Sequence, residues 1–355
     1  LMSKIDTEYH NLLEKILQEG FIYEDPNRKG VNRIEISSYT FRHEFKDGFP
    51  AITTKKLNYK SVVTELIWFL RGDTNIKYLV DNGCNIWNKD AYNYLKKQTK
   101  EGEGIPSDNW FISLIKDGND KLGNLDKVYG YYWRNYDGFD QIQDVIDKMI
   151  NTPMSSEIIV TARNPNDKDN QALPCCHYGF QIVVRPLEYE YEEMSEECEK
   201  HFDKEYHKYS DGDSSAEDYW NQGWYKYAYK TYPKYGFELH WQQRSVDTFL
   251  GLPFNIASYA TLALILEKIT GHKALGIQGD LKKVHLYNNS LDAVKEQLSR
   301  DVDKYDKCDL KMDVLTEVQF QSGIKYINEI EPGSFKLVNY ESYPHIKVEM
   351  LERDK

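Results

Sequence analysis

The chain has 355 residues, enough for one large domain or at most two, and its 14% aromatic and 40% hydrophobic residues predict a packed globule rather than a disordered chain. The net charge of −12 opposes nucleic-acid binding over the whole surface, but it allows one small anionic ligand in a local arginine pocket. Because no run of 18 apolar residues occurs and the first residues lack the apolar segment of a signal peptide, we expect a cytoplasmic protein with no membrane partner.

Hydrophobic periodicity predicts helices from Asp6 or Thr7 to Gly20 and over residues 61–70, 139–150 and 255–270. Strands are expected over 33–45, 157–162, 178–184, 237–243 and 273–280, and again near the C-terminus. The helix over 255–270 is hydrophobic on most sides, which is typical of a central helix. This mixture indicates an α+β fold, in which a mixed β-sheet is backed by helices.

Two stretches read as insertions into one large domain, at about 93–124 and 186–235. The first has few apolar runs. The second has 13 acidic residues against six lysines, and it also holds ten of the 28 tyrosines, which is too aromatic for a solvated tail. We expect a folded surface excursion there, with a partner-binding lobe as the alternative.

The five cysteines bear on the compartment and on metals. They are Cys84, Cys175, Cys176, Cys198 and Cys308, and they form neither a CxxC pair nor a spacing typical of a metal site. Such cysteines are expected to be reduced thiols in a reducing compartment, and no metal is predicted.

The densest motif is residues 243–260, which read QRSVDTFLGLPFNIASYA. A polar loop leads into Gly-Leu-Pro and then into a buried helix that begins at Asn255. Taken singly, Arg244 is typical of a surface ion pair and Asn255 of a helix N-cap. The run as a whole closely resembles the signature of the thymidylate synthase family.

A second motif, residues 171–181, reads QALPCCHYGFQ and resembles the nucleophile segment of that family. A lone buried cysteine is usually inert packing, but a Cys-His pair at the start of a predicted strand favours a functional thiol. The resemblance places Cys176, beside His177, at the nucleophile position. Cys175 replaces a proline or similar residue and is expected to be structural.

Further matches follow in the family's order along almost the whole chain. They are residues 27–30 (NRKG, resembling the phosphate loop), 48–56, 65–75 (ELIWFLRGDTN), 85–87, 128–130, 285–289 and 343–350 (YPHIKVEM, matching the C-terminal strand). The resemblance implies a single thymidylate synthase-like catalytic domain. It also implies a homodimer whose sheets pack back to back.

The resemblance implies covalent catalysis on a pyrimidine. The Cys176 thiolate adds to C6 of dUMP, so that C5 can attack the methylene of 5,10-methylenetetrahydrofolate. Arg244, together with Arg28, is expected to favour the thiolate and to hold phosphate. Asn255 can pair with O4 and N3–H of uracil together, which argues for dUMP rather than dCMP. Glu65, on an apolar helix, is the expected general acid/base acting through water.

The site residues that the resemblance implies fall in three groups. The catalytic residues are Cys176, Glu65, Asn255, Arg244, His177 and Tyr129. The substrate-binding residues are Arg28, Gln243, Arg244, Ser245 and Asn255, with His285 and Tyr287 on the ribose hydroxyl. The cofactor-binding residues are Lys55 for the glutamyl tail, Asp247 for the pterin, and Ile86, Trp87, Leu250, Gly251 and Phe254 for the folate.

Three departures from the family pattern concern the partner subunit and the product. Ser156 and Glu157 stand where two arginines usually reach the other subunit's phosphate, Asp90 replaces a folate-facing tryptophan, and the chain continues for five residues after Met350. A polar Asp90 and a displaced C-terminus favour entry of water, which would capture the methylene intermediate. The sequence therefore favours a deoxyuridylate hydroxymethylase giving 5-hydroxymethyl-dUMP.

Two alternatives remain for the activity. One is a thymidylate synthase giving dTMP and dihydrofolate, and the other is a catalytically silent homologue that acts as a binding protein. A hydroxymethylated pyrimidine would suit a phage that modifies its genome, in which case the enzyme would work in the host cytoplasm.

Overall fold

The computed structural model describes residues 4–100, 103–119, 121–167, 171–188, 232–313 and 329–351. Its centre is a mixed sheet of seven strands in the order β1-β2-β7-β5-β4-β3, with β6 paired to β7 outside this order. β5 and β6 run parallel to β7, and the other neighbouring strands are antiparallel. The strands are β1 (Phe21–Glu24), β2 (Asn32–Glu44), β3 (Ile159–Thr161), β4 (His177–Pro186), β5 (Tyr235–Gln243), β6 (Val246–Asp247) and β7 (Lys273–Tyr287), and a separate pair, β8 (Asp309–Met312) and β9 (Phe335–Val338).

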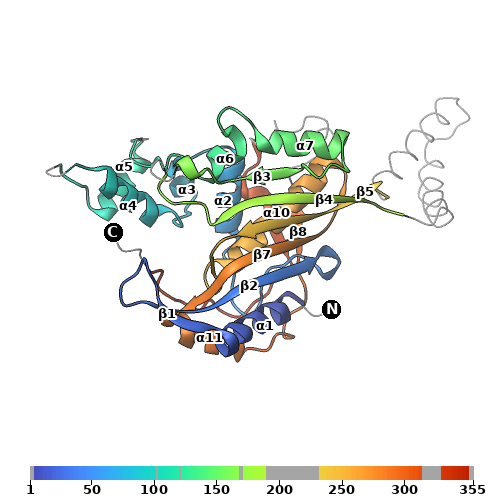
Figure 1. Ribbon diagram of the computed structural model, residues 1–355, viewed down its shortest axis with the longest axis horizontal. Coiled ribbons are helices and arrows are strands. Elements are labelled where there is room, and N and C mark those ends of the chain that lie inside the picture. Colours follow the sequence, from blue (N-terminus) through green and yellow to red (C-terminus); the bar gives the residue numbers. More distant parts are fainter. Residues whose placement is uncertain are drawn as a thin grey trace, which may run out of the picture.

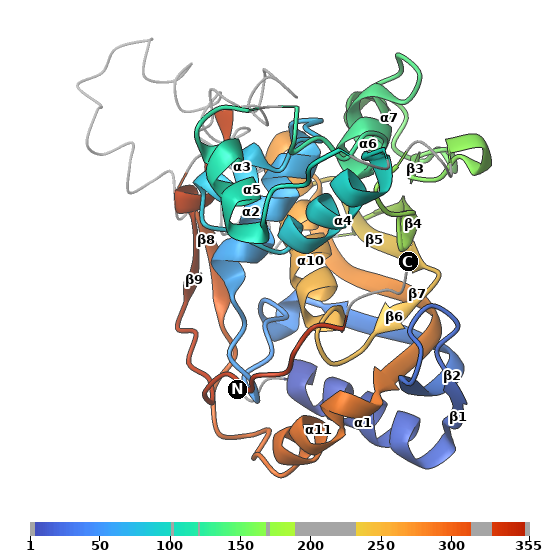
Figure 2. The ribbon, with the colours of Figure 1, turned by 90° about the vertical axis from the view of Figure 1, so that its left-hand side faces the viewer.

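Helices cover one face of the main sheet (Figures 1 and 2). α10 packs on β7 and β5, and α2 and α7 pack on α10, whereas α1 lies over β2. The short helices α4 and α5 contact each other and project from the edge of the molecule in Figure 1. The helices are α1 (Lys4–Glu19), α2 (Tyr59–Leu70), α3 (Lys77–Asp81), α4 (Asn88–Gln98), α5 (Asp108–Lys116), α6 (Tyr129–Asn135), α7 (Gln141–Asn151), α10 (Leu252–Thr270) and α11 (Leu291–Leu298).

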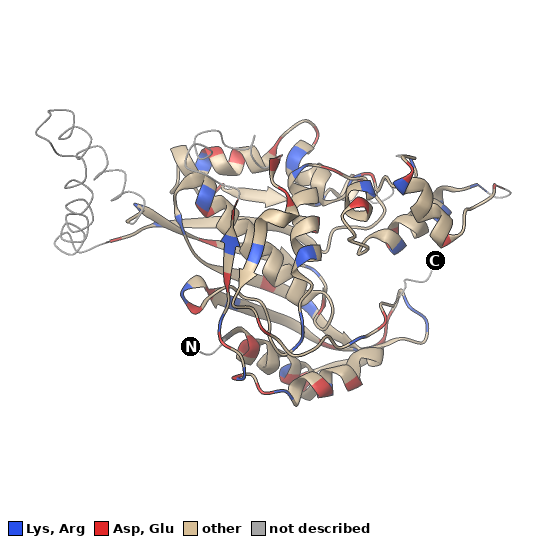
Figure 3. Cartoon of the chain, turned by 180° about the vertical axis from the view of Figure 1, so that it is seen from behind, with Lys and Arg blue, Asp and Glu red and all other residues tan. Residues whose placement is uncertain are grey.

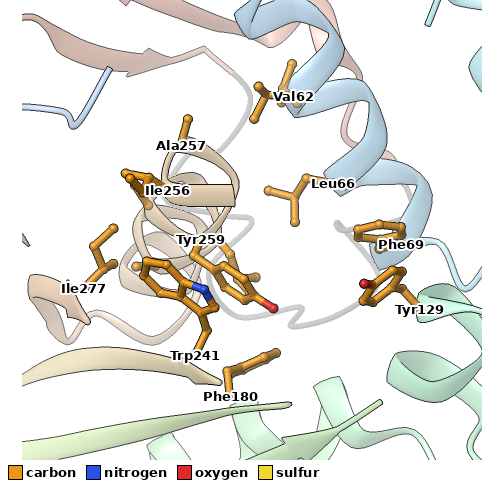
Figure 4. Close-up of a cluster of buried hydrophobic side chains, with 14 of the residues drawn as sticks. Val62, Leu66, Phe69, Tyr129, Phe180, Trp241, Ile256, Ala257, Tyr259 and Ile277 are labelled. Atoms are coloured by element: carbon orange, nitrogen blue, oxygen red, sulfur yellow. The ribbon is translucent and has the colours of Figure 1, made fainter. Parts of the chain in front are cut away.

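α10 forms the apolar centre of the molecule. It ends at Gly271, whose φ of 72° is a conformation that glycine adopts without strain. On the neighbouring strands, Trp241 of β5 lies across Gly279 of β7, where a Cβ would come within 2.4 Å of the indole ring. Figure 4 shows Trp241 and Tyr259 side by side in this cluster, with Phe180 below them. The glycine therefore makes room for the aromatic packing that supports α10.

α2 has one acidic residue, Glu65, in an otherwise mostly apolar helix. The Asn58 side chain caps its first turn by accepting a hydrogen bond from the Ser61 amide (3.3 Å). Apart from Lys60 and Glu65, every residue of α2 is buried. Because α2 packs between α10 and α6, its only acidic side chain faces a poorly solvated region.

The α+β prediction is confirmed. The predicted helices and strands of the central region appear within three residues of their expected bounds, except that β7 continues to Tyr287, seven residues beyond the expected end at 280. The prediction of a C-terminal strand over residues 343–350 is wrong. That stretch has no strand pairing and is held by separate hydrogen bonds: the Tyr343 amide donates to the Thr53 carbonyl (2.8 Å), and Arg300 donates to the Pro344 carbonyl (2.8 Å). Isolated contacts to loops replace the strand that the family resemblance implied.

The two predicted insertions differ in what the structure says of them. Residues 93–124 include the end of α4 and all of α5, whose Phe111 and Ile115 are buried. Within 186–235, residues 189–231, with Cys198, lie outside the described residues. The assignment of both stretches as insertions stays a prediction.

Two surface expectations concern membranes and charge. Among the described residues, α10 alone is long and apolar enough to cross a membrane. Of its most apolar 18-residue segment, 67% is buried inside the protein, as in the core helix of a globular fold. Acidic and basic residues alternate along the ribbon in Figure 3 and are not segregated into separate elements among the described residues.

Candidate active site

Cys176 and Arg244 meet where β4 and β5 pair. Cys176 directly precedes β4, and Arg244 directly follows β5. The Arg244 amide donates to the Cys176 carbonyl (2.9 Å), and its Nη2 lies 3.7 Å from the Cys176 Sγ. Arg244 also donates from Nε to the Cys175 carbonyl (3.0 Å) and from Nη2 to the Pro174 carbonyl (2.9 Å). These bonds fix a positive charge beside the thiol, as is typical of the surroundings of reactive cysteines.

The two adjacent cysteines have different environments. Cys175 is 4% exposed, and burial raises the pKa of its thiol far above the usual range. Cys176 is half-buried and faces Arg244. Because the thiolate is the nucleophilic form, the structure favours Cys176 for that role and Cys175 for packing.

His177 lies between two tyrosines beside the nucleophile. Its ring stacks on Tyr129 at 4.3 Å with 22° between the planes, and its Nδ1 is 2.9 Å from the Tyr259 hydroxyl. Burial lowers the pKa of His177 to about 3, so the imidazole is neutral at pH 7. The Tyr129 hydroxyl accepts a hydrogen bond from the Cys176 amide (2.8 Å). The structure thus brings Tyr129, His177 and Cys176 together, as the sequence predicted.

Glu65 faces the same region from α2. Its carboxylate accepts a hydrogen bond from the Trp87 indole Nε1 (2.6 Å). Burial raises the pKa of Glu65 to about 7, although the Trp87 bond opposes the shift. The Trp87 ring lies 6.2 Å from the Tyr129 ring, and Ile86, directly before Trp87, is half-buried. An acid with both protonation states populated near pH 7 is suited to proton transfer.

Asn255 is oriented by Gln243. Asn255 Nδ2 donates to Gln243 Oε1 (3.1 Å), and Gln243 Nε2 donates to the Ser245 carbonyl (3.1 Å). The Trp241 indole also donates to Gln243 Oε1, at 3.3 Å. Asn255 keeps its carbonyl oxygen and a second N–H for a ligand, which is the pattern that a uracil edge requires.

Asp247 organises the turn that leads into α10. Its Oδ1 accepts hydrogen bonds from the amides of Phe249 and Leu250, both at 3.1 Å, and the Gly251 amide donates to its carbonyl (3.0 Å). Leu250, Gly251 and Phe254 are all half-buried. Four of the predicted folate contacts therefore lie close in sequence, from Asp247 of β6 through the turn to Phe254 in the first turn of α10, and their role stays a prediction.

Lys55 lies deeper than the sequence suggested. Its ammonium donates to the Phe249 carbonyl (2.5 Å) and sits 3.6 Å from the centre of the Phe249 ring, and burial lowers the pKa of the amine to about 7. Asp6 holds the preceding loop by accepting hydrogen bonds from the amides and hydroxyls of Thr53 and Thr54. Here the Lys55 side chain stabilises the turn before α10. To contact a glutamyl tail, as predicted, its ammonium would have to break the hydrogen bond to the Phe249 carbonyl.

Arg28, His285 and Tyr287 form a second group at the β2–β7 pair. The Arg28 guanidinium lies 5.0 Å from the centre of the Tyr287 ring and donates to the Leu351 carbonyl (3.4 Å). The Tyr287 hydroxyl accepts a hydrogen bond from Arg33 (3.2 Å). His285 Nε2 is buried without a partner among the described residues, which fits an atom kept for a ligand. Arg28 is engaged here, so the guanidinium beside the nucleophile is that of Arg244 instead.

The family model described as thymidylate synthase matches residues 7–200 and 224–352 of the chain. The chain belongs to the thymidylate synthase family. It is 34% identical over 347 residues to the thymidylate synthase of Mycoplasma mobile, covering 97% of this chain and 99% of that protein. The thymidylate synthase of Malacoplasma penetrans is 33% identical over 344 residues (96% and 98%), and that of Mycoplasma pneumoniae is 33% identical over 347 residues (97% and 99%).

The resemblance read from the sequence is thereby confirmed at the level of the family. The chain is a pyrimidine-nucleotide one-carbon transferase of the thymidylate synthase family, which uses 5,10-methylenetetrahydrofolate as co-substrate. The relatives named above are bacterial thymidylate synthases, so they support neither the hydroxymethylase that we favoured from the sequence nor a phage source. The family model leaves residues 201–223 unmatched, inside the second predicted insertion.

Sequence reasoning missed three side chains that shape the site. Tyr259 bonds His177, Asp6 holds the loop before Lys55, and Arg33 bonds Tyr287. Tyr259 could have been found, since it lies four residues after Asn255 and therefore on the same face of a helix. The other two contacts are long-range and carry no local signal.

Proposed function

We propose that this protein is a thymidylate synthase that converts dUMP to dTMP and releases dihydrofolate. The observation that carries the proposal is the Cys176 thiol, half-buried beside the fixed guanidinium of Arg244 with 3.7 Å between Nη2 and Sγ. The names of the three bacterial relatives support the same activity. A silent binding protein would not need a thiol kept next to a cation and an acid whose pKa is about 7.

The proposed reaction uses each group once. The Cys176 thiolate adds to C6 of dUMP, and the electron pair moves toward O4, where the amide of Asn255 stabilises the developing charge. C5 then forms a bond to the methylene carbon of the folate and loses its proton through water to Glu65. The bond between the methylene carbon and the folate nitrogen then breaks, which leaves an exocyclic methylene on C5 and a bound tetrahydrofolate. Hydride from that tetrahydrofolate adds to the methylene carbon as the thiolate leaves C6, giving dTMP and dihydrofolate.

The C-terminal stretch supports the methyl product over the hydroxymethyl product. Leu351 is bonded by Arg28 (3.4 Å), and the Glu349 carbonyl accepts a hydrogen bond from Asn289 (2.9 Å). A stretch anchored beside the predicted phosphate and ribose residues helps to exclude water, which hydride transfer requires. Asp90, the departure that suggested a wet site, is half-buried in the first turn of α4.

Identification of both products tests this choice. The protein is incubated with dUMP and 5,10-methylenetetrahydrofolate, and the nucleotide mass and folate absorbance are recorded. We expect dTMP and dihydrofolate in equal amounts. Release of 5-hydroxymethyl-dUMP with tetrahydrofolate would show that water captures the intermediate and would restore the hydroxymethylase.

Base selection is proposed to rest on Asn255. An Asn255→Asp variant is expected to lose dUMP activity by about 100-fold or more and to gain activity on dCMP, because a carboxylate accepts from the cytosine amine but repels uracil O4. Initial rates with both nucleotides check this expectation. A wild-type enzyme that already prefers dCMP would contradict it.

We also propose a homodimer in the cytoplasm. The sheet face opposite α10 exposes Val183 (44%) and Ile159 (48%) among polar side chains, which suits contact with a second copy. Ser156 and Glu157 are exposed next to β3 and carry no positive charge, so cross-subunit phosphate binding is expected to be weaker than in relatives with arginines. Light scattering that reports a monomer at micromolar concentration would contradict the dimer.

A further inference from the structure

Tyr259 connects the core of α10 to the histidine next to the nucleophile. Its side chain is 2% exposed, and its hydroxyl lies 2.9 Å from His177 Nδ1. The ring is fixed on its other sides, because it stacks on Trp241 at 5.1 Å with 11° between the planes and meets Phe180 edge-on at 6.0 Å. In Figure 4 the hydroxyl points away from Trp241, toward the side on which Tyr129 lies.

The direction of the hydrogen bond follows from protonation. Burial raises the pKa of Tyr259 well above its usual value, so the phenol keeps its proton, and the buried imidazole of His177 is neutral. A buried O–H must be donated to an acceptor. Among the described residues, Nδ1 of His177 is the hydrogen-bond partner of that hydroxyl. This geometry favours Nδ1 as the acceptor, with the imidazole proton on Nε2.

We propose that Tyr259 is a positioning residue that holds His177 in its Nε2–H tautomer, with the ring plane stacked on Tyr129 beside Cys176. The chain of contacts runs from the Tyr259 hydroxyl to His177, from the His177 ring to Tyr129, and from the Tyr129 hydroxyl to the Cys176 amide. Nε2–H is then a fixed donor on the ring, available to a bound ligand or water. The effect on turnover rests on the proposed function, whereas the tautomer does not.

Nitrogen NMR of the protein labelled with ¹⁵N-histidine tests the tautomer directly. His177 is assigned by the signals that disappear in a His177→Asn variant. We expect wild-type His177 to show a protonated Nε2 and an unprotonated Nδ1 at pH 7. A protonated Nδ1 in the wild-type protein would overturn the proposal, whether or not the protein makes dTMP.

Tyr259→Phe removes the hydroxyl and keeps the ring that stacks on Trp241. We expect His177 to become a mixture of tautomers and kcat to fall about 10- to 100-fold, the scale of a misplaced catalytic group, with KM for dUMP within about twofold. The matched control is Tyr59→Phe. This substitution on α2 removes a buried hydroxyl that bonds Thr261 of α10 (3.0 Å), the helix that also carries Tyr259, but does not bond His177. The control is expected to keep the single tautomer and a kcat close to that of the wild type.

A double-mutant cycle separates positioning from general destabilisation. If Tyr259 acts through His177, the kcat effect of Tyr259→Phe disappears in the His177→Asn background. Equal losses in both backgrounds, or an unchanged tautomer in Tyr259→Phe, would overturn the proposal. Absence of turnover in the wild-type enzyme would count against the proposed function alone.

Discussion

Cys176→Ser is expected to lower kcat by at least about 10⁴-fold, whereas Cys175→Ser keeps kcat within about tenfold of the wild type. A serine hydroxyl at position 176 stays protonated beside Arg244 and is a far weaker nucleophile than a thiolate. Cys175 is not expected to have such a role, because it is buried and its raised pKa keeps the thiol protonated.

Single-turnover rates with dUMP and folate measure this difference, and thermal unfolding controls for damage to the fold. Cys175→Ser places a hydroxyl in an apolar site and is expected to cost about 1–3 kcal/mol of stability, so its assay belongs well below its melting temperature. Equal loss of activity in two folded variants would show that the nucleophile is not Cys176 alone.

Glu65→Gln is expected to lower kcat about 10²- to 10⁴-fold and to remove a break in the pH profile. Since the pKa of Glu65 is raised to about 7, the carboxylate that we propose as acceptor of the C5 proton forms as pH rises through 7, and wild-type kcat/KM is expected to increase over that range. The glutamine keeps an oxygen for the Trp87 indole but accepts no proton. A pH profile of Glu65→Gln with the same break near 7 would contradict the assignment.

The same substitution has a predicted effect on stability. Burial raises the pKa of Glu65 from 4.5 to about 7, so the folded state binds the proton more tightly than the unfolded state. This contribution to stability is complete below pH 4.5 and is lost as pH rises toward 7. At pH 8, Glu65→Gln is therefore expected to be about 2–3 kcal/mol more stable than the wild type by urea unfolding, and near equal at pH 4.

The predicted site residues that the structure brings together are those carried by contiguous motifs. Cys176 with His177, and Arg244, come from short runs at the ends of β4 and β5, so strand pairing brings them together, and Asn255 of α10 joins them through its hydrogen bond to Gln243. Long-range contacts were not predictable in this way. The ammonium of Lys55 donates a hydrogen bond to the Phe249 carbonyl, 194 positions away, and Arg28 donates to the carbonyl of Leu351, near the C-terminus.

The fold shows the same division. α10 was predictable because its apolar residues fill most of the helix surface. α2 was predictable because its apolar run is followed, after Arg71, by Gly72, which stops the helix. Residues 343–350 were expected to form a strand from their match to the family, yet the carbonyls and amides there bond to Thr53, Arg300 and Asn289 rather than to a neighbouring strand. A motif match predicts which residues occur, but not which backbone groups lie alongside them.

The most direct test of covalent catalysis by Cys176 is to trap the adduct. With 5-fluoro-dUMP and 5,10-methylenetetrahydrofolate, C5 carries a fluorine that cannot leave as a cation, so the reaction should stop with enzyme, nucleotide and folate joined. Mass spectrometry of the digested protein then locates the modification. We predict one adduct, carrying both ligands, on the sulfur of Cys176. An adduct on Cys175, or no adduct from an enzyme that makes dTMP from dUMP, would contradict the mechanism.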